Sequence, residues 1–430
     1  APRGTALLSA DVARARIHFT AQEGWINDPL GLTYHEGQYH LFFQFVPGQT
    51  EWGPNQRWGH ATSPDALHWT EGPVALEPGD GDDGVWSGSL VQPKGEPAAL
   101  FYTTVNTPDV QIGKARIARP TDSSWTTWDK GRVVAELPAD VDVVAFRDPY
   151  VFHDGTTWRM LMGAGLTDGT ATALTFSSDD LQDWKYDGLL ASRHRDETEP
   201  VWMGAVWECP QLFPLGDKWV LTVSVWEPFV PYYEGYAIGT YENGRFTAES
   251  WHRLSYGPSY YAGSAFEDRN GERGLIYWLR GVDDSHGRWA SAHSVPHVLE
   301  LDGDRVVASP HASVVSWRAG DAASVRDATV EVASTCDLEL ALDGPGARAT
   351  LTLDEDTLGL TAAAGQVSVS TPAGEWSMPT AGVGIRVLID GPVVEVFTAA
   401  GVLAAPLTAP AGSRKLTVEG GATARVWDLA

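Results

Sequence analysis

Residues 24–45 read GWINDPLGLTYHEGQYHLFFQF. The triplet Asn27-Asp28-Pro29 leads into a run of strand-forming residues, which turns at Glu36-Gly37 and continues as a second run through Gln44. Asp-Pro beside Gly is common turn chemistry, so this opening alone indicates only a turn that leads into a β-hairpin. Similar openings elsewhere in the chain indicate that the hairpin belongs to a repeat.

Three further stretches predict hairpins of the same form, with turns at Asp154-Gly155, Gly216-Asp217 and Asn270-Gly271. Five openings align, and they are Asn27-Asp28-Pro29, Trp86-Ser87-Gly88, Arg147-Asp148-Pro149, Trp207-Glu208-Cys209 and Tyr261-Ala262-Gly263. Their middle residues are 59, 61, 60 and 54 residues apart. The segments TSPDALHW (62–69) and SSDDLQDW (177–184) also match within their units. Five β-units of similar length favour a five-bladed β-propeller, in which the openings would start the inner strands at one central channel.

The C-terminal quarter has a different pattern. Residues 328–430 alternate apolar and polar positions, as in VSVS and VVEVFT, and they contain few Trp. This alternation is typical of a β-sandwich. We therefore expect an all-β chain with a propeller over residues 1–310, a linker over 311–320 and a sandwich over 321–430.

Composition excludes several classes of function. A net charge of −26 argues against nucleic acid and disfavours polyanionic substrates. No apolar run approaches the roughly 20 residues of a membrane span, so no membrane partner is expected. Cys209 and Cys336 form neither a disulfide framework nor a zinc spacing. The chain begins at Ala1 without Met and shows no hydrophobic signal core, and we expect a secreted protein rather than a cytoplasmic one.

Three of the five openings carry an acid at the same position, namely Asp28, Asp148 and Glu208. Turn statistics explain an Asp-Pro pair but not Glu208. Three carboxylates that face one channel repel each other, so at least one should have a raised pKa. Separated pKa values of neighbouring carboxyl groups supply a glycosidase with a nucleophile and an acid.

Metal binding is the competing use of clustered acids. The acidic segment GDGDDG (79–84) lacks the EF-hand spacing and its terminal Glu, and the twelve His include no HExxH pair. The sequence also lacks a GxSxG elbow and a phosphate loop. We expect no metal and no cofactor.

The ordered segments HFTAQEGWINDPLGL, WGH, WSGS, FRDPYVF and WECPQLF resemble motifs of glycoside hydrolase family 32, which contains invertases, inulinases and levanases. IRVLIDGPVVEVFT (385–398) resembles a strand pair of the family's C-terminal sandwich, so the resemblance covers nearly the whole chain. It implies a five-bladed propeller plus sandwich and a retaining attack on the β-fructofuranosyl C2. By this resemblance Asp28 matches the nucleophile, Glu208 the general acid/base and Asp148 the acid that binds fructose hydroxyls and stabilises the transition state.

The same matching implies a set of fructose contacts: Asn27, Gln44, Trp52, Trp86, Ser87, Arg147 and Trp278. Alternatives exist for several of them. Gln44 could satisfy backbone groups, Trp52 and Trp278 could be packing residues, and Arg147 could only neutralise Asp148. Cys209 is interpreted as a buried neighbour that affects the environment of the acid.

The chain departs from the family pattern at two places. Leu30 replaces the usual Asn after Asp-Pro, while Ser259 and Gly263 stand where the family more often has an Asp and a larger residue. We expect both segments to shape the pocket rim and the leaving-group side.

The predicted function is a retaining β-fructosidase that acts on terminal fructosyl linkages of sucrose, levan or inulin. A fructosyltransferase, including one that forms a difructose anhydride from levan, would share the covalent intermediate and stays open. If the protein were a non-catalytic carbohydrate-binding propeller, at least one of the three acids should be missing, whereas all three are present. A propeller with a structural or protein-interaction role would not need the Trp and acid openings.

Overall fold

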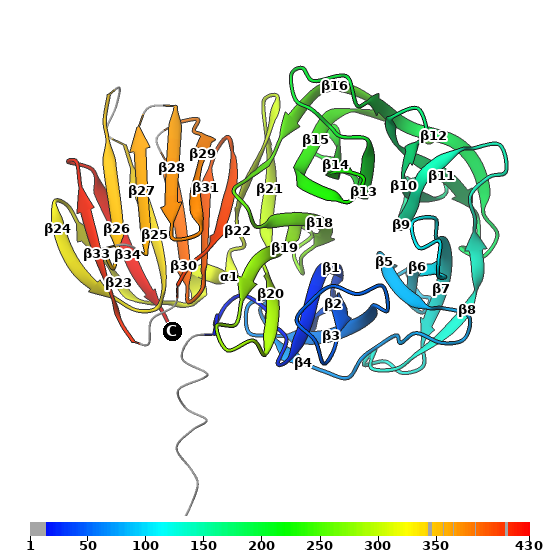
Figure 1. Ribbon diagram of the computed structural model, residues 1–430, viewed down its shortest axis with the longest axis horizontal. Helices are drawn as coiled ribbons and strands as arrows, with labels where there is room; N and C mark the ends of the chain where they lie inside the picture. Colours follow the sequence, from blue (N-terminus) through cyan, green and yellow to red (C-terminus); the bar gives the residue numbers. More distant parts are fainter. Residues whose placement is uncertain (1–13, 343–345, 356, 364, 383, 409–411) are drawn as a thin grey trace, which may run out of the picture.

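The computed structural model describes residues 14–342, 346–355, 357–363, 365–382, 384–408 and 412–430. Within these ranges nearly all regular structure is β, with one short helix, α1 (Ser313–Ser316). Figure 1 shows a ring of β-sheets formed by the larger N-terminal part, with a stack of two sheets from the C-terminal part beside it. No helix of the described residues is long and apolar enough to cross a membrane. The expected all-β fold, a propeller followed by a sandwich, is confirmed.

The propeller has five blades, each built from antiparallel strands. Blade I contains β1 (Gly24–His35), β2 (Gln38–Val46), β3 (Arg57–Ser63) and β4 (Thr70–Glu71). Blade II contains β5 (Gly84–Val91), β6 (Ala99–Val105), β7 (Lys114–Pro120) and β8 (Trp128–Ala135). Blade III contains β9 (Val143–His153), β10 (Trp158–Leu166), β11 (Thr170–Ser178) and β12 (Lys185–His194). Blade IV contains β13 (Val206–Leu215), β14 (Lys218–Glu227), β15 (Val230–Glu242) and β16 (Arg245–Arg253).

Blade V closes the ring. It contains β18 (Tyr260–Glu267), β19 (Arg273–Asp283), β21 (His297–Asp302) and β22 (Arg305–Pro310). A further strand, β20 (Trp289–His293), pairs antiparallel with β19 and parallel with β1. The last blade is therefore hydrogen-bonded to the first, which leaves no open edge between them. All four predicted hairpin turns are confirmed, because each lies between the first two strands of its blade.

The five aligned openings lie inside the first strands of the five blades and do not precede them. Each strand begins one to four residues before its opening, so the expectation that the openings start the strands is wrong. Strand pairing shifts register within 26–29, 86–88, 147–150, 208–211 and 261–264, which makes each opening a β-bulge. A bulge leaves its extra residue unpaired and tolerates Pro, which explains how Pro29 and Pro149 can stand within a strand.

The matching segments in blades I and III form the same turn. Ser63 and Ser178 end the third strands of their blades, and each hydroxyl donates to an Asp two residues later, at 3.0 and 3.1 Å. Both Asp side chains accept backbone N–H groups of the following turn, and the intervening Ala66 and Leu181 have φ near +65° (64° and 66°). The repeat read from the sequence therefore corresponds to repeated local structure.

The C-terminal domain consists of two stacked sheets. The seven-stranded sheet has the order β17 (Ser255–Tyr256), β32 (Gly401–Pro406), β31 (Val393–Thr398), β30 (Gly384–Asp390), β25 (Thr335–Ala341), β34 (Thr423–Leu429) and β23 (Arg318–Val325). The six-stranded sheet has the order β24 (Ala328–Val332), β33 (Arg414–Glu419), β26 (Ala349–Leu353), β27 (Leu358–Ala363), β28 (Gln366–Thr371) and β29 (Gly374–Pro379). Of the expected linker, residues 313–316 form α1, and β23 already begins at Arg318.

The two domains are joined by apolar and charged contacts. One core cluster combines Phe213 and Leu275 of the propeller with Leu388 and Phe397 of the sandwich, and β17 from the end of blade IV adds to the sandwich sheet. His18 binds two buried sandwich carboxylates, Asp390 at 2.7 Å and Glu395 at 2.6 Å. The segment before blade I is therefore fixed against the second domain.

Candidate active site

The three acids of the openings meet around one cysteine. The Cys209 Sγ lies 3.6 Å from Asp28 Oδ2 and 3.7 Å from Asp148 Oδ2, and the Cys209 backbone N–H donates to Asp148 Oδ2 at 3.0 Å. Glu208 is the residue before Cys209, so blades I, III and IV bring their carboxyl groups together. Both cysteines are free, and burial raises the pKa of the Cys209 thiol, which keeps it protonated between the two aspartates.

Besides the Cys209 thiol, two neutral donors hold Asp28. The Ser87 hydroxyl donates to its Oδ2 at 2.5 Å, and Asn27 Nδ2 donates to its Oδ1 at 3.1 Å. Trp25 Nε1 in turn donates to the Asn27 amide oxygen at 2.9 Å. Burial raises the pKa of Asp28, the charge of Glu208 adds to that effect, and the Ser87 and Asn27 hydrogen bonds oppose it. Both oxygens of Asp28 are thus fixed in direction.

Asp148 occupies an uncommon backbone conformation at the bulge of blade III. Its φ is +69°, which an Asp tolerates better than most residues, and its N–H donates to Thr103 Oγ1 at 2.9 Å. Burial raises the pKa of Asp148 to about 7; the Arg147 charge opposes this, whereas those of Glu208 and Asp28 raise it further. The raised carboxyl pKa expected from three converging acids is therefore found at Asp28 and Asp148.

Glu208 is contacted on both oxygens. Arg147 Nη2 donates to Oε1 at 2.8 Å, and the Tyr261 hydroxyl donates to Oε2. Arg147 also donates to the Gln111 side chain at 3.0 Å, and its guanidinium lies 4.9 Å from the centre of the Trp226 ring. The side chain of Glu208 is 18% exposed, which leaves it accessible from solvent. The direct ionic partner of Arg147 is Glu208 and not its neighbour Asp148.

The expected aromatic contacts form two separate groups of rings. Trp86 is buried and donates through Nε1 to the Pro54 carbonyl at 2.8 Å, while Trp52 is 49% exposed and meets Trp86 edge to face at 5.8 Å. In the second group the ring centre of Trp278 lies 5.8 Å from that of Trp25 and 6.2 Å from that of Tyr261. Exposed Trp52 is available for a ligand, whereas Trp278 also contributes to packing.

Gln44 binds the backbone beside the Trp86-Ser87 bulge. Its side chain is buried, and its amide nitrogen donates to the carbonyl of Val85 at 2.8 Å, the residue before Trp86. This contact is the backbone interaction considered as the alternative for Gln44. It connects the first two blades beside the Trp86-Ser87 bulge.

A fourth carboxyl group lies beneath the site and was missed by the sequence reasoning. Glu234 is paired across blade IV with Ser224, which is itself paired with Glu208. Its side chain is fully buried and accepts hydrogen bonds from the Ser224 hydroxyl at 2.8 Å and the Gly263 N–H at 3.2 Å. Burial raises the pKa of Glu234 to about 8, so it is neutral at pH 7. Tyr261 was noted only as the start of the fifth opening, without a role in the site, and Gln111 and Thr103 were missed because they lie in no motif.

The two departures from the family pattern have structural explanations that differ from the expectation. Leu30 does not shape a rim, because it is buried with Phe42 and Trp58 in the core between blades I and II. Ser259 is fully buried as well. Gly263 leaves room for the fourth acid, since a Cβ there would lie 2.8 Å from Glu234 Oε1.

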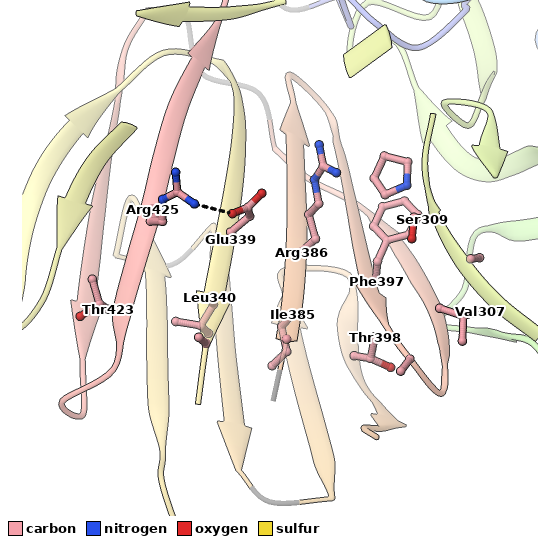
Figure 2. Close-up of a pocket in the computed structure, with 15 residues that line it drawn as sticks. Val307, Ser309, Glu339, Leu340, Ile385, Arg386, Phe397, Thr398, Thr423 and Arg425 are labelled. Carbon is pink, nitrogen blue, oxygen red and sulfur yellow. Dashed lines mark hydrogen bonds and ion pairs between the residues drawn. The ribbon is translucent and has the colours of Figure 1, made fainter. Parts of the chain in front are cut away.

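Other polar and hollow regions are separate from the three acids. Asp82, in the acidic turn of blade II, binds Arg116 at 3.0 Å and Lys130 at 2.8 Å. Among the described residues no group of three or more His, Cys, Asp and Glu side chains could hold a metal ion. A hollow of about 540 Å³ lies between β22 and the sandwich and is lined by apolar residues such as Phe397. Figure 2 shows the side chains that line it, with the Glu339–Arg425 pair among them. The hollow contains none of the three acids.

Comparison with known proteins agrees with this arrangement. The sequence model described as "Glycosyl hydrolases family 32 N-terminal domain" matches residues 18–310. The sucrose-6-phosphate hydrolase of Zymomonas mobilis is 33% identical over 319 residues, which cover 68% of this chain and 61% of that protein. The fructan 6-exohydrolase of Beta vulgaris is 30% identical over 354 residues, which cover 72% and 56%. The chain thus spans less than two thirds of the length of these relatives.

A solved structure shows the same fold over both domains. The β-fructofuranosidase of Bombyx mori superimposes with a TM-score of 0.83 and 24% identity, covering 97% of this chain and 94% of that one. The family match covers more than half of the chain, and all three acids of the bulges lie within it. The chain therefore belongs to glycoside hydrolase family 32.

Proposed function

We propose that the protein is a retaining β-fructosidase that releases fructose from sucrose or from the ends of fructans such as levan and inulin. The observation that carries this proposal is the convergence of Asp28 and Asp148 on the Cys209 thiol, beside Glu208, at the bulges of three blades. The names of the relatives, which include a sucrose-6-phosphate hydrolase and a fructan exohydrolase, support the substrate class.

Asp28 is the proposed nucleophile. Its carboxylate attacks the fructosyl C2 while the bond from C2 to the leaving oxygen breaks, which forms an ester between enzyme and fructose. The Ser87 and Asn27 hydrogen bonds fix the Asp28 oxygens, so the carboxylate needs little reorganisation before attack. The raised pKa of Asp28 makes it a stronger base once ionised.

Glu208 is the proposed acid and base. It gives its proton to the leaving oxygen in the first step and takes a proton from water in the second, when the water oxygen replaces Asp28 at C2. Tyr261 and Arg147 orient the two Glu208 oxygens before substrate arrives. Both steps invert the configuration at C2, so the product retains the configuration of the substrate.

Asp148 is proposed to accept hydrogen bonds from fructose hydroxyl groups, which strengthen as positive charge develops on the sugar ring. Its backbone is fixed by Thr103 and its carboxylate by the Cys209 N–H. Exposed Trp52 and buried Trp86 would cover one face of the sugar.

Product analysis tests the function. Wild-type protein is incubated with sucrose, levan and inulin, and the products are separated by chromatography, with Asp28→Asn as the matched inactive control. We expect glucose plus fructose from sucrose and fructose alone from the ends of at least one fructan. Longer oligosaccharides or cyclic fructose dimers as main products would show transfer, and cleavage by Asp28→Asn at the wild-type rate would exclude the assigned nucleophile.

A further inference from the structure

We infer that the tip of the β14–β15 hairpin is a carbohydrate-binding platform for the leaving-group part of a neutral fructan chain. The inference deepens the proposed function and depends on it. The platform consists of exposed Phe229 and Tyr232, with buried Trp226 packed against Phe229 and Trp202 packed against Tyr232.

The platform presents large apolar side chains to solvent. Phe229 is 80% exposed, and Val230 and Tyr232 next to it are exposed as well. Phe229 meets Trp226 edge to face at 6.0 Å, and Tyr232 meets Trp202 at 4.8 Å in the same manner. Such a cluster on one hairpin costs solubility unless something binds it, and aromatic side chains offer flat faces to sugar rings.

Two chains of contacts connect this hairpin to Glu208. The first runs from Glu208 to Arg147, whose guanidinium lies over Trp226, the neighbour of Phe229. The second runs from Glu208 to Tyr261 and on to Arg280, whose guanidinium lies 5.0 Å from the centre of the Tyr261 ring.

Arg280 also donates to the Pro231 carbonyl at 3.1 Å and to the Tyr232 carbonyl at 2.9 Å, which fixes the hairpin tip. The platform is therefore attached to the residue that would protonate the leaving oxygen. Sugar units on that side of the cleaved bond would meet it.

The backbone at Phe229 supports a role in binding. The two-residue turn Pro228-Phe229 joins β14 to β15, and Phe229 has φ of +70°, a conformation that Gly usually supplies after Pro in a turn. A bulky side chain in this region is strained by about 1 kcal/mol or more. Because the ring is 80% exposed and its one ring contact is the edge of Trp226, its packing within the fold offsets little of that strain. Contacts between the ring and a bound ligand would offset that strain.

The charges at the hairpin fit a neutral ligand. Arg195 is paired with Glu227 at 2.7 Å, and Arg280 is engaged with backbone carbonyls. A phosphorylated leaving group would need an available cation, while the sugar units of a fructan need apolar faces and polar edges. The platform therefore points to a neutral oligosaccharide, in contrast to the phosphorylated sugar in the name of several relatives.

The test compares substrates that reach the platform with one that is too short to cover it. The ratio of kcat/KM on inulin or levan oligosaccharides to kcat/KM on sucrose is measured for wild type, Phe229→Gly, Phe229→Trp and the control Val315→Ala. Val315 is an exposed apolar residue on α1. Phe229→Gly removes the ring and relieves the backbone strain, so its melting temperature should not fall.

We expect Phe229→Gly to lower this ratio about three- to tenfold, the usual range for one aromatic contact. Phe229→Trp should restore it, and Val315→Ala should not change it. If Phe229→Gly leaves the ratio of kcat/KM on oligosaccharides to kcat/KM on sucrose unchanged, the hairpin tip is not a binding platform. This holds even if the activity on both substrates falls equally. A wild-type preference for sucrose 6-phosphate over sucrose overturns its neutral character. Absence of any fructose release by wild type would instead refute the proposed function.

Discussion

Arg147 lies against Glu208 with two guanidinium nitrogens on one oxygen, Nη2 at 2.8 Å and Nε at 3.3 Å from Oε1. The two residues come from equivalent bulges in neighbouring blades, at the start of β9 and of β13. Arg147 therefore orients Oε1 of Glu208, the proposed acid and base, and the Tyr261 hydroxyl orients Oε2.

Arg147→Lys should lower kcat/KM on sucrose about 100-fold. Lysine keeps the charge but cannot reproduce the planar contact with Glu208 or the simultaneous bond to Gln111. Steady-state kinetics measures the effect, with Arg195→Lys as control because Arg195 pairs with Glu227 at the surface. Activity within threefold of wild type would show that the orientation of Glu208 does not depend on this pair.

The pH dependence should follow the two aspartates. Asp148 has a pKa of about 7 and the pKa of Asp28 is also raised, so both carboxylates become protonated at a higher pH than an ordinary Asp does. Because both act as carboxylates in the proposed mechanism, kcat/KM should decline below about pH 7. The Asp148→Asn variant should have a much lower kcat/KM than wild type, and its remaining activity should decline at a lower pH. A wild-type decline that begins only near pH 4 would contradict the assignment.

Glu234→Gln should stabilise the protein increasingly as the pH rises. Glu234 has a pKa of about 8 when buried and an ordinary value near 4.5 when unfolded, so the folded state binds the extra proton between these values. The contribution of Glu234 to the free energy of unfolding therefore falls as the pH rises from 4.5 to 8. Gln reproduces the neutral form, and the gain at pH 7 should be about 3 kcal/mol.

Urea unfolding at pH 5 and pH 7 measures this difference, with exposed Glu300→Gln as the control. An equal effect of Glu234→Gln at both pH values would mean that Glu234 does not change its protonation on folding.

His18→Leu should weaken the junction between the two domains. Burial opposes protonation of His18, but the hydrogen bonds and charges of Asp390 and Glu395 outweigh it and raise its pKa to about 9. Removing the cation leaves Asp390 and Glu395 buried without the charge that lies between them, although Glu395 keeps its contact with His297 at 2.8 Å. The expected cost is about 3–5 kcal/mol. In wild type the stabilisation by His18 is complete below pH 6.5 and is lost as the pH rises through 9.

Thermal unfolding from pH 6 to pH 9 measures this dependence, with exposed His286→Leu as the control. A melting temperature of His18→Leu equal to that of the control would show that the apolar contacts alone join the domains.

The sequence predicted the parts of the site that repeat. The spacing of the five openings indicated the five blades. The acids at three of these openings indicated that Asp28, Asp148 and Glu208 converge, because equivalent positions in a radial repeat face one axis. It did not predict that the openings are bulges, since the local residues of an Asp-Pro turn and an Asp-Pro bulge are the same. Glu234 and Tyr261 could not be found either, because their role depends on cross-strand pairing and on space left by Gly263.

The orientation of Leu30 illustrates the same limit. Its position beside Asp28 suggested a pocket residue, but successive residues of a strand point to opposite faces and a bulge changes that alternation locally. Only the register of β1 against β2 shows that Leu30 faces the core.

The role of Asp28 as nucleophile is best tested by trapping the covalent fructosyl-enzyme intermediate. Glu208→Ala is mixed with an aryl fructoside, whose leaving group needs no proton, quenched in acid and analysed by mass spectrometry of peptides. Loss of the acid and base should impair cleavage of sucrose far more than cleavage of the aryl fructoside, and should slow release of the ester. We expect one fructosyl group on the peptide that contains Asp28. Equal losses on both substrates, with no modified peptide or with the group on another residue, would contradict it.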